Sequence, residues 1–110
     1  MTDRAKKYLV DILDSISLIE DFLVGIEEFE SYSQDFKTKS AIERQSGIIG
    51  EAVNQFQKIE LTSQFSSSKQ IISFRNRIIH AYDSIDDTIV WVILKRHIPL
   101  LKKEAEVFLG

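Results

Sequence analysis

The residue types best suited to chemistry in this sequence lie within eight positions, from Arg75 to Tyr82. Asn76 follows Arg75 directly, His80 comes four residues later, and Tyr82 closes the segment. Arginine presents a rigid fork of N–H donors that matches a phosphate, and histidine exchanges protons near neutral pH. These residue types therefore suit chemistry at a phosphate group, in which one side chain holds the phosphate and another moves protons.

The segment around Arg75 conflicts with its own helical pattern. At about 100° per residue, Arg75 and Tyr82 fall in the middle of an apolar stripe. The stripe consists of Ile71, Ile72, Ile78 and Ile79. An arginine there costs free energy unless its guanidinium is paired or reaches a solvent-filled cleft. Two interpretations stay open: Arg75 pairs with a buried acid, Glu51 or Glu43, and only fixes the helix register, or it belongs to a functional site.

Helix geometry separates the two residues that would act together. His80 lies about 7.5 Å along the axis from Arg75 and about 140° around it, whereas Asn76 and His80 share nearly the same face. On one straight helix Arg75 and His80 do not converge. Either the helix unwinds before His80, or a second copy of the chain completes the site, which would make the protein a homodimer.

The elements that must position this segment are helices. One proline and four glycines in 110 residues leave few breaks, and apolar residues recur every three or four positions. The pattern predicts helices over about residues 3–30, 40–58, 69–80 or 82, and 87–108, joined by polar turns at 31–39, 63–68 and 83–87. We therefore expect a single domain over residues 1–110, an all-α up-and-down bundle of four or five helices.

Local signals set the ends of these helices and their contacts. Ser40 and Glu43 have the spacing of a capping box at the start of the second helix, and a start a few residues earlier stays open. Ile42, Ile49, Val53 and Phe56 are the predicted core face of that helix. Gly47 and Gly50 within it indicate close approach of another helix. Pro99 should kink or split the last helix after His97.

Composition restricts the function further. The net charge is −3, so any RNA contact must be local or supplied by a partner. With no cysteine, no signal peptide and no apolar run of transmembrane length, we expect a cytoplasmic protein that does not contact a membrane. His80, Asp83, Asp86 and Asp87 match no zinc-ligand spacing, and no phosphate-binding glycine loop is present, so we expect no metal and no cofactor. The basic run at 95–97 is interpreted as a solvated helix face.

The combination Arg-Asn-x3-His-x-Tyr at 75–82 resembles the signature of the HEPN superfamily, in the tyrosine-bearing form of its HepT branch. The resemblance extends to Ala-Ile-Glu-Arg at 41–44, Ile-Ile-Gly-Glu-Ala at 48–52, Ile-Val-Trp at 89–91 and Ile-Pro-Leu-Leu at 98–101. It covers most of the chain from about residue 40 onward. The turn after Tyr82 differs from that of many relatives in having Asp83 and further acids.

This resemblance implies the toxin of a type VII toxin–antitoxin pair, a dimeric, metal-independent ribonuclease acting on an RNA such as tRNA or mRNA. In RNA the ribose 2′-hydroxyl can attack the adjacent phosphate, and DNA should be spared because it lacks that hydroxyl. Its partner would be an MntA-type nucleotidyltransferase antitoxin. By position, Arg75 and His80 would be the catalytic pair, Asn76 a supporting polar residue, and Tyr82 the residue that the antitoxin adenylylates to silence the toxin. The alternative is a non-catalytic helical module that binds a nucleotidyltransferase partner.

Overall fold

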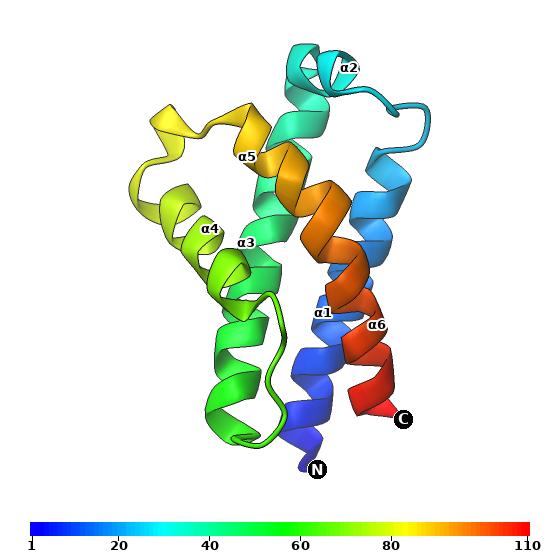
Figure 1. Ribbon diagram of the computed structural model, residues 1–110, viewed down its shortest axis with the longest axis vertical. Helices are drawn as coiled ribbons and strands as arrows, with labels where there is room; N and C mark the ends of the chain where they lie inside the picture. Colours follow the sequence, from blue (N-terminus) through cyan, green and yellow to red (C-terminus); the bar gives the residue numbers. More distant parts are fainter.

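Helices form the framework of the protein, which is described from a computed structural model (Figure 1). The structure describes the backbone of residues 1–110 and every side chain except that of Tyr82. The elements in chain order are α1 (Asp3–Phe22), α2 (Phe29–Gln34), α3 (Phe36–Ile59), α4 (Ser68–His80), the 3₁₀ turn η1 (Tyr82–Ser84), α5 (Asp87–Val92), the π-helical turn η2 (Ile93–His97) and α6 (Ile98–Leu109). The predicted all-α bundle is confirmed, with α2 as its short fifth helix.

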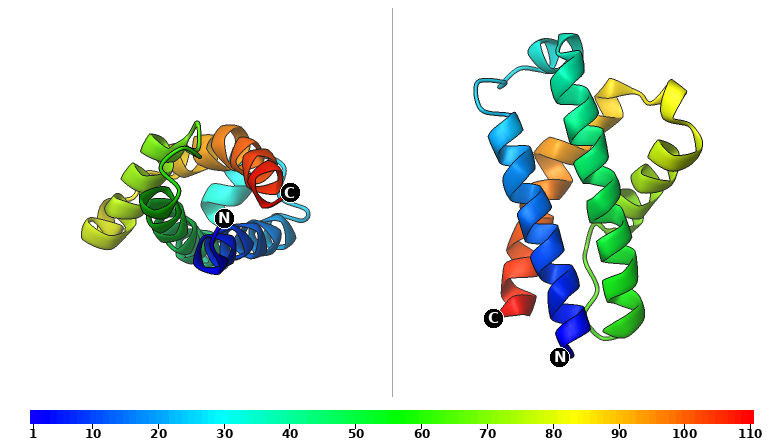
Figure 2. Two further views of the ribbon diagram at one scale, coloured as in Figure 1. Left: turned by 90° about the horizontal axis from the view of Figure 1, so that it is seen from below. Right: turned by 180° about the vertical axis from the view of Figure 1, so that it is seen from behind.

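The long helices enclose one core, and α4 lies at its edge. Helix α3 packs against both α1 and α4, while α6 packs against α1 (Figures 1 and 2). The predicted core face of α3 is fully buried, and α1 meets it with Leu9, Ile12, Ile16 and Ile19. Because α4 touches α3 on one side and η2 on another, part of its surface remains open.

The first connection differs from the prediction. Helix α1 ends at Phe22 rather than near residue 30, and Gly25 then adopts a positive φ of 83°, a conformation that favours glycine. The predicted polar turn at 31–39 instead contains α2, whose Tyr32 is fully buried with its ring 5.6 Å from that of Trp91. Burial of this ring outweighs the polar character of the segment.

The second long helix begins four residues before Ser40, within the range that the sequence left open. Helix α3 begins at Phe36, where the Asp35 carboxylate accepts a hydrogen bond from the Thr38 N–H at 3.0 Å. Ser40 therefore lies inside the helix and is not its cap. An aspartate at the N-cap satisfies the free amides as well as a serine does, and it comes a turn earlier in the chain.

The predicted interruption near Pro99 is confirmed. Proline has no N–H to donate, and its ring clashes with the carbonyl one turn earlier. The chain responds with the wider π turn η2, in which the Ile98 N–H bonds to the Ile93 carbonyl, and α6 begins at Ile98. The helix axis continues while its register shifts.

The two glycines of α3 play different parts in its contact with α4. A Cβ at Gly50 would overlap the Arg75 Cβ and lie 2.8 Å from its Cγ and 3.3 Å from the Ile71 carbonyl oxygen. At Gly47 the nearest atom, the Ile78 Cγ2, would be 4.0 Å away. The predicted close approach is therefore confirmed at Gly50, whereas Gly47 has room for a methyl group.

Gly50→Ala and Gly47→Ala form a matched pair that tests this contact. Gly50→Ala should lower the free energy of unfolding by about 1–3 kcal/mol, because α4 must move away from α3. Gly47→Ala should raise it by up to about 1 kcal/mol through helix propensity. Urea unfolding of both variants measures the difference, and equal stabilities would contradict the close contact.

Candidate functional site

Arg75 lies where α4 crosses α3, with its side chain on Gly50. Its Nη2 donates to the Glu51 carboxylate at 2.5 Å, and its Nη1 donates to the Asn76 side-chain oxygen at 2.9 Å. Of the two acids considered from the sequence, Glu51 is thus the partner. Glu43 lies instead near Asp87, and burial followed by this neighbouring charge raises the pKa of the Glu43 carboxyl.

The Arg75–Glu51 pair is only partly withdrawn from water. The side chains are 25% and 45% exposed, so the pair contributes on the order of 1 kcal/mol or less to folding. Each Nη carries two N–H groups, so Glu51 and Asn76 leave Arg75 with donors for an anion. The Nε of Arg75 is buried and has no partner among the described residues. Glu51 and Asn76 hold the guanidinium in place without using all of its donors.

His80 and Asn76 occupy a different face of α4 from Arg75. Both are exposed, and His80 is the last residue of the helix. The Ala81 N–H bonds to the Arg77 carbonyl at 2.8 Å and closes the final turn. The helix therefore does not break before His80, and that alternative is wrong. The structure joins Arg75 to Asn76 but does not bring His80 to Arg75 within one chain. The predicted modification site Tyr82 begins η1, and its side chain lies outside the described residues.

The apolar stripe of α4 is covered only at its inner end. Ile71 is buried, but Ile79, which lies beside Arg75, is 50% exposed. On α3, Ile48 is 39% exposed. Together they border an open groove of about 450 Å³, which reaches Tyr8 on α1 and contains the Arg75–Glu51 pair. The groove thus places apolar surface beside the exposed side of the arginine.

Two of the acids after the motif, Asp86 and Asp87, have structural roles. Asp86 caps α5 by accepting from the Thr88 N–H at 2.9 Å and the Thr88 hydroxyl at 2.6 Å, and these bonds lower the pKa of its carboxyl. Asp87 forms an ion pair with Lys39 of α3 at 2.7 Å. These contacts fix the start of α5 against α3.

His97 is a residue whose setting the sequence did not disclose. The solvated-face interpretation holds for Lys95 and Arg96, but His97 is half-buried, with its Nδ1 2.7 Å from the Ser67 hydroxyl. Burial lowers the pKa of its imidazole, and the charge of Arg96 acts in the same direction. The available signal was its position four residues after Ile93, on the buried side of the last helix.

The serine-rich connection at 63–68 is tied to the last helix at a second point. The Ser66 hydroxyl donates to Glu104 at 2.6 Å, beside the Ser67 contact with His97. These two bonds fix the start of α4 against η2 and α6. The predicted loop is confirmed, and its hydroxyls bind distant helices.

The sequence profile of the family described as "Ribonuclease HepT-like" matches residues 12–108. The chain belongs to this family. Among curated relatives, "Probable ribonuclease HepT" of Thermococcus cleftensis is 36% identical over 92% of both chains. "Putative RNase MJ1380" of Methanocaldococcus jannaschii is 31% identical over 93% of this chain and 94% of its own. No solved structure matches the chain. The HepT-like resemblance found in the motif is thus confirmed.

In this HepT-like chain, none of the helices formed by the described residues has the length and apolar character that crossing a bilayer requires.

The buried setting of His97 predicts a pH dependence of stability. Because its folded pKa lies below its unfolded value of about 6.5, the unfolded chain binds the proton first as pH falls. The free energy of unfolding should therefore drop as the pH is lowered through about 6.5 and level off below the folded pKa. His97→Asn should flatten this slope in urea unfolding series from about pH 8 to 5. An unchanged slope in the variant would contradict the assignment.

Proposed function

We propose that this protein is the toxin of a type VII toxin–antitoxin pair and an endoribonuclease that cleaves RNA without a metal ion. The observation that carries the proposal is Arg75, fixed by Glu51 and Asn76 yet with free donors, in a HepT-like motif at the groove where α4 crosses α3. The names of the curated relatives support a ribonuclease.

The reaction needs only groups that the motif contains. His80 takes the proton from the 2′-hydroxyl, whose oxygen attacks the adjacent phosphorus. The bond from phosphorus to the 5′-oxygen breaks, and the leaving 5′-oxygen takes the proton from the protonated His80, which returns to its neutral form and leaves a 2′,3′-cyclic phosphate on the RNA. Arg75 stabilises the charge that develops on the phosphoryl oxygens. Glu51 and Asn76 act as positioning residues, because they hold the guanidinium rather than the RNA.

A second copy of the chain would bring a His80 side chain to Arg75, which the His80 of the same chain does not reach. Since α4 is unbroken through His80, Arg75 and His80 of one chain point in directions about 140° apart. Exposed Ile48 and Ile79 border the groove around Arg75, and a twofold contact there would cover them. We therefore include a homodimer in the proposal, with each site formed from two copies of α4.

We also propose that Tyr82 receives an adenylyl group from an MntA-type nucleotidyltransferase. Its position two residues after His80 supports this assignment. The transferred group would add bulk and a negative phosphodiester close to the motif. RNA phosphate would then be excluded from Arg75 by occupancy and by charge.

The ion pair gives one reason to retain the alternative, a non-catalytic module. Arg75 does have an acid at hydrogen-bonding distance, as a purely structural arginine would. The ribonuclease and the non-catalytic module differ in how substitution of Arg75 or of Glu51 affects the rate of RNA cleavage.

Breaking the pair from each side in turn tests catalysis directly. With EDTA present, the wild type should cleave single-stranded RNA, and Arg75→Met and His80→Ala should each lose at least about a hundredfold in rate. Methionine retains the methylene groups that pack on Gly50. Glu51→Gln, which breaks the same ion pair but retains the arginine, should lose less than about tenfold. Arg4→Gln on α1 serves as a charge-matched control.

Thermal melting of each variant shows that loss of activity is not loss of folding. If Arg75→Met and His80→Ala both cleave at the wild-type rate, the assignment of the catalytic pair fails. If the wild type itself does not cleave RNA, the ribonuclease assignment fails and the non-catalytic module replaces it.

Mixing two inactive variants tests whether the site is shared between chains. Arg75→Met and His80→Ala each destroy every site in their own homodimer. A mixed dimer retains one site that combines Arg75 of one chain with His80 of the other. Unfolding and refolding the two together should restore about a quarter of the wild-type rate, since half the dimers are mixed and each has one intact site of two. No recovery in a mixture that forms mixed dimers would place the site within one chain.

A further inference from the structure

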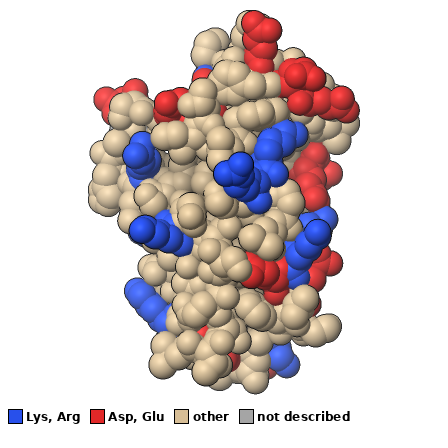
Figure 3. Space-filling model, in the orientation of Figure 1, with Lys and Arg blue, Asp and Glu red and all other residues tan. Residues whose placement is uncertain are grey.

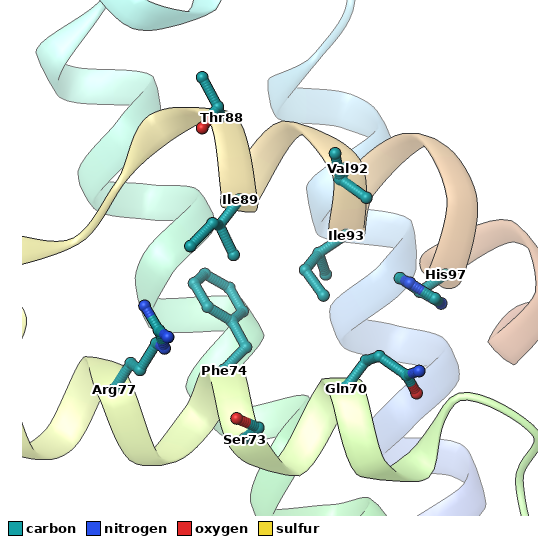
Figure 4. A pocket seen from close by; sticks show the side chains of 9 residues that line it. All are labelled: Gln70, Ser73, Phe74, Arg77, Thr88, Ile89, Val92, Ile93 and His97. Carbon is teal, nitrogen blue, oxygen red and sulfur yellow. The ribbon is translucent and has the colours of Figure 1, made fainter.

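A second cavity lies on the other side of α4, facing α5 and η2. Its volume is about 360 Å³ (Figure 4). Phe74, Ile89, Val92 and Ile93 supply its apolar surface, and Arg77 and His97 stand at its opposite ends. Neither Arg75 nor His80 lines it.

We infer that this cavity binds a single nucleotide of the RNA substrate, with the base against the apolar wall and a flanking phosphate at Arg77. The inference rests on the proposed ribonuclease function and extends it to a substrate contact away from the catalytic pair.

The lining has the chemistry of a site for a flat heterocycle. An unstacked RNA base is held by apolar and aromatic contact on its faces and by hydrogen bonds at its edges. Figure 4 shows the guanidinium of Arg77 at one end of the cavity and the Gln70 amide beside the His97 ring at the other. The Gln70 amide offers both a donor and an acceptor. Ser67 occupies the Nδ1 of His97, which leaves the Nε2 for a ligand.

The charge around the cavity favours a phosphate although the chain as a whole is acidic. Arg96 lies close enough to His97 to affect its pKa, so cations stand at both ends of the cavity. Lys and Arg side chains lie over α4 and over the last helices, and acids gather toward the α2 end, at the turn between α4 and α5 and along the α1–α6 edge (Figure 3). The Asp86 carboxylate lies near enough to Arg77 for the charge of Arg77 to help lower its pKa, and one of its oxygens accepts both bonds from Thr88. The positive charge for an RNA phosphate is therefore local to the ends of the cavity.

The place and the size of the cavity fit an adjacent nucleotide. Arg77 precedes His80 by three residues, which is about 4.5 Å along the axis and about 60° around it. An RNA strand at His80 therefore passes the cavity within a short reach. A volume of 360 Å³ is near the lower end of the range of about 300–1,000 Å³ for ligand sites, which suits one ring system better than a segment of a partner protein.

Methyl-labelled protein titrated with AMP, UMP or a short single-stranded RNA tests the site. The His80→Ala protein is used so that RNA remains intact. The methyl signals of Ile89, Val92 and Ile93 should shift with each ligand, while those of Ile12 and Ile42 in the main core should not. Cavity signals that stay unchanged with all three ligands overturn the inference.

Two variants in the same background link the cavity to RNA affinity. Val92 is 47% exposed, so Val92→Trp fills the cavity without disturbing the core, and Arg77→Gln removes the charge at one end. Each should weaken RNA binding by roughly tenfold in fluorescence anisotropy, and Arg4→Gln should bind like its parent. Unchanged affinity in both cavity variants overturns the inference. It is also overturned if Val92→Trp abolishes antitoxin binding and leaves RNA affinity intact, because the cavity would then be a protein contact.

Wild-type cleavage measured in parallel separates this inference from the proposed function. If nucleotides bind the cavity but the wild type does not cleave RNA, the nucleotide site stands and the ribonuclease function fails. If the wild type cleaves RNA and Val92→Trp cleaves it with the same KM, the function stands and the cavity inference fails.

Discussion

The contact between Gly50 of α3 and the side chain of Arg75 on α4 sets the geometry of the rest of the site. A glycine at this crossing lets the arginine lie directly on a helix backbone, where Glu51 of the next position meets it. The close approach also fixes how far α4 stands from the core. An arginine in an apolar stripe is therefore compatible with folding because the neighbouring helix provides both the space and the counter-charge.

Helix α4 has only thirteen residues, and each of its three faces has different surroundings. One face packs on α3 and includes Arg75, a second exposes Asn76 and His80, and a third lines the cavity toward η2 with Phe74 and Arg77. Such a division is possible because α4 lies at the edge of the bundle. A helix in the centre would have had to bury all three faces.

The sequence predicted what depends on local spacing. The periodic apolar faces, the glycine at the α3–α4 crossing, the interruption at Pro99 and the conflict around Arg75 could all be inferred from intervals of one to four residues. Choosing between Glu51 and Glu43 required the register of α3 against α4, which local patterns do not contain. Excluding a helix break before His80 required the structure in the same way, since a broken helix and a second chain would relieve the same geometrical conflict.

Contacts between distant parts of the chain account for the errors. Helix α2 exists because Tyr32 meets Trp91, and His97 leaves the solvated face because Ser67 meets it. These partners lie 59 and 30 residues away, and the polar composition of the segments gave no indication of them.

The two bonds from Ser66 and Ser67 also determine when α4 acquires its position. Their partners, Glu104 and His97, come 38 and 30 residues later in the chain, so the ribosome delivers them after α4. Until they emerge, the start of α4 has neither bond. The motif helix is therefore fixed in place only after α6 has been synthesised, and a nascent chain that still lacks α6 does not yet hold Arg75 and His80 on a fully anchored helix.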